Sequence, residues 1–137
     1  MTKTEVKNDV GGHKHCLMCG TDNPRSLGLK FLADVSGNVY SQFIGNAFLQ
    51  GYPGILHGGV ITSLLDCAMT NCLFNKQIEA VTGELNVKFH QSIPCNASLE
   101  IKASVKTDMN PLYVVQATIF HLGKLMASSE AKFMRKR

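Results

Sequence analysis

One stretch of the chain, residues 57–75, has the periodicity of a long α-helix, and no other segment shares it. Apolar side chains recur there in pairs spaced four residues apart, which gives a helix with a wide apolar face. The rest of the 137-residue chain alternates apolar and polar side chains with a period of two, as strands do. A single apolar helix among strands should form the core around which a sheet curls.

The alternating segments lie on both sides of this helix. Residues 29–36 and 39–45 should form a hairpin before it. Four strands should follow it, at residues 80–90, 99–106, 113–122 and 125–133. In the first of them, strict alternation places Thr82 and Glu84 on the same face. The predicted fold class is α+β, with an antiparallel sheet of five to six strands wrapped around one long central helix. Because the far side of the helix and the sheet edge would stay uncovered, we expect two copies to dimerise through their sheets.

Length and composition suit one domain. With 45% hydrophobic and 18% charged residues, the chain should bury about two-thirds of its unfolded surface. We expect a flexible N-terminus over residues 1–12 and the folded domain over residues 13–137. No apolar run approaches the ~20 residues of a membrane span, and the polar start has no signal-peptide core.

Cysteine count and charge indicate a location and exclude some partners. Five cysteines, an odd number, suggest a reducing cytoplasm rather than a disulfide framework. The net charge is +4, but the chain has no nucleic-acid motif and few aromatic side chains to stack on bases. We therefore expect a cytoplasmic protein without a membrane or nucleic-acid partner.

Asp66 interrupts the apolar helix, where an unpaired carboxylate is costly to bury. With Thr62 and Thr70 it forms a polar stripe at the spacing i, i+4, i+8. The stripe is either the solvated face of the helix, or it faces a wet cleft in which Asp66 serves as a base or a nucleophile.

The helix starts with His57-Gly58-Gly59. The first backbone N–H groups of a helix lack partners and carry partial positive charge, and glycine lets a ligand oxygen approach them closely. An oxyanion hole needs such donors, although a plain turn into the helix is the alternative. Gly58 and Asp66 are eight residues apart, about 12 Å along a helix, so they cannot both reach one carbonyl group. We therefore hypothesise an active site shared between two subunits.

These motifs resemble those of the hotdog-fold acyl-CoA thioesterases, specifically the phenylacetate-pathway (PaaI-like) branch. The most specific part is Leu56-His57-Gly58-Gly59 with an acidic residue nine positions after the histidine. Further similar segments are residues 50–54, residues 83–89, and the leader of residues 16–20 with 23–24 and 27–29. The resemblance spans roughly residues 15–134 and implies the hotdog fold and hydrolysis of an acyl-CoA thioester, with no cofactor.

The resemblance also implies roles for single residues. The Gly58 N–H would bind the thioester oxygen, while Asp66 of the partner subunit activates water or attacks directly. His57 would orient the loop or hydrogen-bond near the leaving sulfur, unless it only satisfies the start of its helix. Thr82 would orient the acid or the water, unless it is an ordinary strand threonine. Gln50 matches an amide that holds the water, although it lies one position further upstream than in some relatives.

Coenzyme A should lie along strand ends and the turns that follow them, as the resemblance implies. The expected substrate-binding residues are Gly59, Phe89, His90, Lys106 and Asn110. The expected assembly is a homodimer or a dimer of dimers. Two other functions stay open: a hotdog acyl-thioester hydratase or dehydratase, and a non-catalytic acyl-CoA-binding dimer.

Four side chains that can ligate a metal lie within seven residues: His13, His15, Cys16 and Cys19. Cys-x-x-Cys is half of a zinc site, but no second such pair follows, and a tetrahedron from consecutive residues would be cramped. Cys67 and Cys72 are assigned to the core of the helix. The sequence therefore predicts packed or free thiols and no metal.

Overall fold

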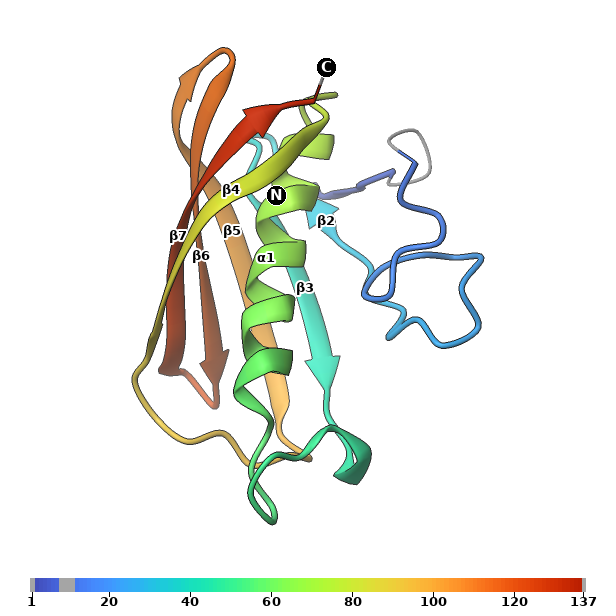
Figure 1. Cartoon of the computed structure of the whole chain (residues 1–137), viewed down its shortest axis with the longest axis vertical. Helices are drawn as coiled ribbons and strands as arrows, with labels where there is room; N and C mark the ends of the chain where they lie inside the picture. The colour runs from blue at the N-terminus through green and yellow to red at the C-terminus, as the bar shows by residue number, and fades with distance from the viewer. Residues whose placement is uncertain (1, 8–11, 137) are drawn as a thin grey trace.

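The computed structural model describes residues 2–7 and 12–136. One seven-stranded antiparallel sheet curls around one long α-helix (Figure 1). Before the helix come β1 (Thr4–Glu5), β2 (Leu32–Ala33), β3 (Val39–Ile44) and a short 3-10 helix (Ala47–Leu49). The helix itself is α1 (Gly58–Phe74). After it come β4 (Ala80–Phe89), β5 (Ser98–Met109), β6 (Leu112–His121) and β7 (Lys124–Arg135).

This architecture confirms the predicted hotdog fold, although the sheet has seven strands rather than five to six. Its order is β1-β2-β3-β5-β6-β7-β4. The additional strand is β1, which pairs with β2 and precedes the buried Val6. Within the segment predicted to be flexible, residues 1 and 8–11 lie outside the described residues. Residues 4–5 differ from that prediction because the edge of β2 offers their backbone hydrogen-bonding partners that the sequence does not reveal.

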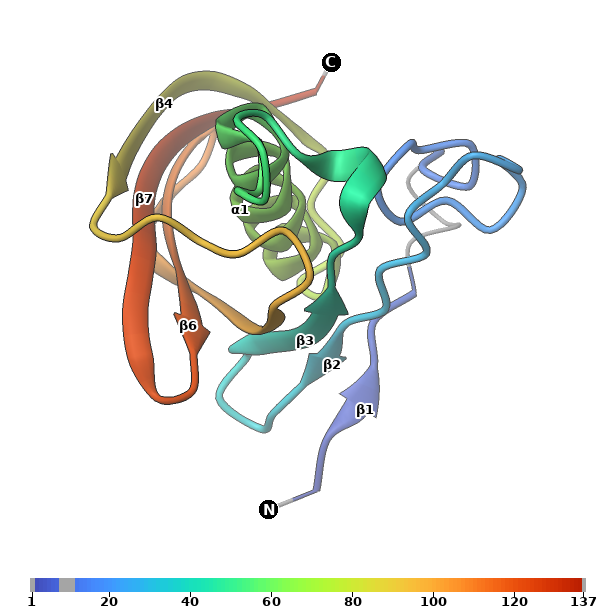
Figure 2. The same ribbon diagram turned by 90° about the horizontal axis from the view of Figure 1, so that it is seen from below.

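The apolar face of α1 fills the hollow of the sheet. Leu64, Leu65 and Met69 are fully buried there, and each such side chain contributes about 1.5–3 kcal/mol through burial. Figure 2 shows α1 inside the curve of the strands. The N-terminal segment of residues 12–31 lies on the other side of the helix (Figure 2). The helix is therefore covered by two different parts of the chain. No helix among residues 2–7 and 12–136 has both the length and the apolar character that crossing a membrane requires.

β4 is the edge strand next to which the polar side of α1 lies. In the described part of the chain it pairs only with β7, and its register shifts between Thr82 and Glu84. Because of this irregularity Thr82 reaches α1, whereas Glu84 lies on the outer face beside Lys132, at 3.3 Å. The predicted common face for these two residues is therefore wrong. Strict alternation fails at a β-bulge, where one extra residue is inserted.

Candidate active site

Within the described part of the chain, the start of α1 presents one backbone donor without a partner. His57 caps the helix, since its Nδ1 accepts a hydrogen bond from the N–H of Gly59 at 2.8 Å. The N–H of Val60 donates to the carbonyl of His57 at 3.0 Å. Among the residues that the structure describes, the N–H of Gly58 has no acceptor. It is therefore available to an oxygen of a ligand at the positive end of the helix dipole.

This donor opens into a pocket of about 570 Å³, within the usual size range of small-molecule sites. The loop before α1, the first turn of the helix and the segment that follows β4 line the pocket. Half of the twelve lining residues carry large apolar side chains: Tyr52, Ile55, Leu56, Ile61, Phe89 and Ile93. A side-chain carbon added at Gly58 would lie 3.8 Å from the ring of Phe89, so that ring lies directly beside the free donor. The arrangement suits an acyl group whose carbonyl oxygen reaches the helix start.

Asp66 lies two turns further along α1 and faces the edge strand. The Thr82 hydroxyl donates a hydrogen bond of 2.7 Å to Asp66 Oδ1, a short contact of the charge-assisted kind. Asp66 is half-buried, and Thr70 beside it is buried. The polar stripe of α1 is therefore not simply a solvated helix face, because it packs partly beneath β4. One oxygen of Asp66 is fixed by Thr82, which orients the carboxylate.

The helix start and Asp66 do not form one site within a single chain. Asp66 is absent from the lining of the pocket that contains Gly58. Instead the two groups are associated with opposite ends of β4, since Thr82 contacts Asp66 near its start and Phe89 packs beside Gly58 at its end. Both halves of the predicted site thus lie along the edge strand β4.

Other predicted site residues have different positions. Gln50 Oε1 accepts a hydrogen bond from the N–H of Gly54 at 2.9 Å, so this oxygen stabilises the loop before α1. His90 lines the pocket and its Nε2 lies 2.9 Å from Ser128 Oγ. The structure does not bring Lys106 and Asn110 into this pocket: Lys106 forms an ion pair with Glu130 at 2.7 Å, and Asn110 lies in the turn after β5.

The placement of Lys106 and Asn110 corrects the expected substrate-binding set for a single chain. Both belong to the long hairpin of β5 and β6, whose turn lies at the opposite end of the sheet from the start of α1 (Figure 1). Gly59, Phe89 and His90 are together near the helix start. Sequence reasoning missed Tyr52 and Ile55 in the pocket lining, because nothing in a loop pattern indicates which side chains turn inward.

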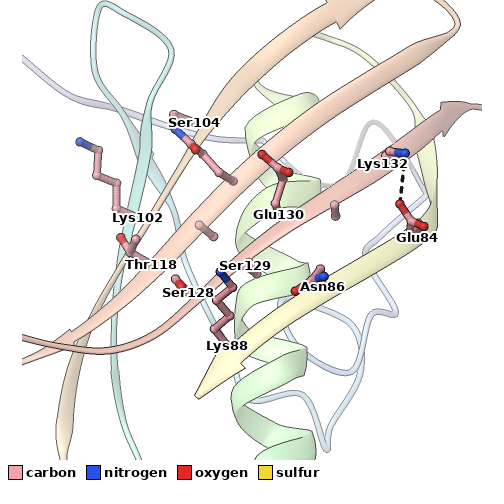
Figure 3. A pocket seen from close by; sticks show the side chains of 13 residues that line it. Glu84, Asn86, Lys88, Lys102, Ser104, Thr118, Ser128, Ser129, Glu130 and Lys132 are labelled. Carbon is pink, nitrogen blue, oxygen red and sulfur yellow. Dashed lines mark hydrogen bonds and ion pairs between the residues drawn. The ribbon is translucent and has the colours of Figure 1, made fainter. Parts of the chain in front are cut away.

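A second hollow, of larger volume, lies on the outer face of the sheet (Figure 3). It has a volume of about 660 Å³ and is formed by side chains of β4, β5, β6 and β7. Its walls carry Glu84, Lys132, Lys88 and Glu130, and two of these, Glu84 and Lys132, are paired with each other. It includes neither Asp66 nor the start of α1. The smaller, more apolar pocket is therefore the candidate active site.

Of the four side chains considered as metal ligands, the structure brings together three, His13, Cys16 and Cys19, while His15 is exposed. The thiol of Cys67 on α1 is near this cluster, because the amide nitrogen of Asn71 lies 3.5 Å from Cys67 Sγ and 3.7 Å from Cys19 Sγ. The pKa of the Cys16 thiol is lowered to about 4. The main cause is hydrogen bonding to the Cys16 sulfur, from the Cys67 thiol first and then from the backbone N–H groups of Cys19 and Met18, although burial opposes the shift. Hydrogen bonding with the thiols of Cys16 and Cys19, together with burial, raises the pKa of the Cys67 thiol.

Comparison with known families matches part of the chain. The family model described as Thioesterase superfamily matches residues 53–107, which include Gly58, Asp66 and Thr82. Acyl-coenzyme A thioesterase THEM4 of Mus musculus is 27% identical over 101 residues, covering 74% of this chain and 44% of that protein. THEM4 of Bos taurus is 36% identical over 52 residues, covering 38% and 21%. The chain thus spans less than half the length of these curated relatives.

Solved structures share the fold. A thioesterase superfamily protein, RHA08564, superimposes with a TM-score of 0.82 at 21% identity, covering 88% of this chain and 63% of that one. The PaaI protein from the E. coli phenylacetic acid degradation operon gives 0.76 at 20%, covering 82% and 83%. The protein smu.793 of Streptococcus mutans, solved bound to acetyl CoA, gives 0.74 at 20%, covering 79% and 88%. At such identities the likeness establishes the fold alone.

Proposed function

We propose that this chain, which has the hotdog fold and matches the Thioesterase superfamily model over residues 53–107, belongs to that superfamily and hydrolyses acyl-CoA thioesters at a site shared between two copies. The observation that carries the proposal is the position of the two polar groups. Asp66 and the free N–H of Gly58 are associated with opposite ends of one edge strand, β4. The relatives support the substrate class, because THEM4 is an acyl-coenzyme A thioesterase and smu.793 binds acetyl CoA.

Pairing of β4 with the β4 of a second copy would complete the site. The strand is ten residues long, has a free edge in the described chain and exposes Val81 and Phe89, which favours strand addition. An antiparallel pair about a two-fold axis near Leu85 and Asn86 sets Thr82 opposite the partner's Phe89, about 5 Å away. Asp66 of one copy then approaches the helix start of the other. Gly58 and Asp66 of different copies can therefore act on one carbonyl group, although within one copy they are about 12 Å apart along α1.

The chemistry follows from these positions. The thioester oxygen accepts a hydrogen bond from the N–H of Gly58, which makes the carbonyl carbon more electrophilic. Asp66 of the other copy takes a proton from water as the water oxygen attacks that carbon, and Thr82 keeps the carboxylate oriented. Collapse of the tetrahedral intermediate breaks the carbon–sulfur bond, and the proton held by Asp66 passes to the leaving sulfur, so that the acid and the CoA thiol are released. Direct attack by Asp66, giving an anhydride that water then cleaves, is the alternative route.

Thiol release from a panel of acyl-CoA esters tests the activity, with Asp66→Asn as the decisive variant. This change keeps the shape of the side chain but removes the base, so we expect kcat to fall by about 10²–10⁴-fold. The matched control is Asp108→Asn, because Asp108 is an exposed carboxylate at the far end of β5, 3.9 Å from Lys76. Equal rates for Asp66→Asn and the unmodified chain would reject the role of Asp66. Water addition to an enoyl-CoA without thiol release would indicate a hydratase instead.

Mixing two inactive variants tests whether the site is shared. Asp66→Asn and Gly58→Pro damage different halves, so each hybrid dimer regains one intact site of its two. Random exchange of subunits makes half of the dimers hybrids, which restores about 25% of the original rate. Activity that never recovers, although mass spectrometry detects the hybrids, would show that both groups act within one copy.

A further inference from the structure

We propose that the chain holds a structural zinc ion between its N-terminal segment and α1, on four side chains: His13, Cys16, Cys19 and Cys67. This proposal replaces the prediction of no metal that was made from the sequence. It does not depend on the proposed thioesterase function, because none of the four lines the pocket at the helix start.

The ligand atoms of the N-terminal three already lie close to the spacing that zinc requires. Those of His13, Cys16 and Cys19 are all within 4.8 Å of one another, and Cys19 Sγ is 3.8 Å from His13 Nδ1. With Zn–S bonds of about 2.3 Å, two sulfur ligands of a tetrahedral site are about 3.8 Å apart. Small side-chain rotations are enough to reach that geometry.

Cys67 supplies the fourth corner from the helix. The amide nitrogen of Asn71 lies 3.5 Å from Cys67 Sγ and 3.7 Å from Cys19 Sγ, so a sulfur of the helix and a sulfur of the loop lie beside the same amide group. Three cysteines with one histidine are a regular ligand set of structural zinc sites. The fourth ligand also removes the objection that seven consecutive residues would give a cramped tetrahedron.

The surrounding groups suit thiolate ligands. Three thiolates and one neutral histidine on Zn²⁺ leave a net negative charge, which N–H donors to sulfur stabilise. The backbone N–H of Met18 donates to Cys16 Sγ at 3.3 Å, and the buried amide of Asn71 donates to the sulfurs of Cys67 and Cys19. Gly20 closes the turn, because a side-chain carbon there would lie only 2.4 Å from the backbone nitrogen of Cys16. The loop is thus shaped to direct its thiols inward.

In this fold, such an ion would have a structural role. Residues 12–31 contain neither a helix nor a strand, and unstructured loops of this length are uncommon in a compact domain. Yet Met18, Cys19 and Leu29 within them are buried. A zinc ion that joins this segment to α1 would hold it in place. Cys19 and Cys67 are both nearly inaccessible, and four protein ligands leave no position for a substrate, so the site is structural rather than catalytic.

Metal analysis of the full-length, tag-free chain, purified without chelators, tests the proposal. We expect about one zinc per chain by mass spectrometry. Replacement of zinc by Co²⁺ should give the intense visible bands and sulfur-to-metal charge transfer of a tetrahedral thiolate site. Cys67→Ser should lower the bound zinc at least about fivefold, whereas Cys95→Ser, a thiol outside the cluster, should leave it unchanged.

The cobalt spectrum of the unmodified chain keeps the test decisive even where Cys67→Ser does not fold. A chain without zinc that also gives no tetrahedral cobalt spectrum would overturn the proposal. So would a disulfide between any of Cys16, Cys19 and Cys67, which leaves only three of the five cysteines reactive in denaturant. Equal zinc in Cys67→Ser and Cys95→Ser would place the metal elsewhere and would overturn it too.

Discussion

Gly58→Pro removes one catalytic hydrogen bond from the proposed site and little else. Proline lacks a backbone N–H, and at the first position of a helix this N–H has no partner inside the helix. His57 before it is extended, with φ −60° and ψ 134°, which is the conformation that a following proline requires. The added side-chain carbon would lie 3.8 Å from the ring of Phe89, an ordinary contact. The substitution therefore fits the backbone as it stands.

The expected magnitudes separate catalysis from stability. Loss of one oxyanion donor costs about 10²–10³ in kcat, or about 2.7–4 kcal/mol of transition-state stabilisation. The folded state loses no hydrogen bond, because the N–H of Gly58 has no acceptor among the described residues. Replacing glycine by proline also restricts the unfolded chain, which favours folding by about 0.4–1 kcal/mol. The variant should be as stable as the parent and almost inactive.

Steady-state thiol release on the preferred acyl-CoA, paired with urea unfolding, measures both quantities. Gly58→Ala is the matched control, since it adds the same first carbon but keeps the N–H, and its kcat should stay within a few-fold of the parent. A Gly58→Pro variant that folds normally and retains its kcat would refute the assignment of this N–H as the oxyanion donor. Equal losses in both variants would indicate a steric effect at Phe89 instead.

Three further predictions concern single contacts. Thr82→Val removes the 2.7 Å hydrogen bond to Asp66, so kcat should fall roughly tenfold with little change in the unfolding temperature; an unchanged kcat would contradict its positioning role. His57→Ala removes the cap of α1 and should cost about 1 kcal/mol in urea unfolding, whereas His57→Asn should recover most of that loss. Leu64→Ala should cost about 2–5 kcal/mol because the side chain is fully buried, while Leu17→Ala, at 58% exposure, should change stability by less than about 0.5 kcal/mol.

The main elements of the fold could be predicted because their periodicity is strong. The helix was expected at residues 57–75 and runs from Gly58 to Phe74, and the strands after it begin close to their predicted positions. The sheet face on which a strand residue lies is harder to predict from sequence. Thr82 and Glu84 lie on opposite faces because of the β-bulge between them, and a bulge has no period of its own to detect.

The candidate site was predicted in part. His57-Gly58 could be identified because a helix start has a sequence signature, and Asp66 because a carboxylate is unusual on an apolar helix. Lys106 and Asn110 were expected near coenzyme A, but the sheet order carries the β5–β6 hairpin away from the helix start. The position of a residue relative to a distant strand end depends on the sheet order, which alternation leaves open.

The sequence by itself determined one apolar helix, the strands around it, and the two chemical groups that the helix carries, because each of these depends on neighbours along the chain. Only the tertiary structure decided which groups meet. It joined Thr82 to Asp66 through 16 positions of intervening chain, and it brought Cys67 to the thiols of the N-terminal loop about 50 positions away. Such encounters are set by how the helix rotates against the sheet and the loop, which depends on the packing of every buried side chain together.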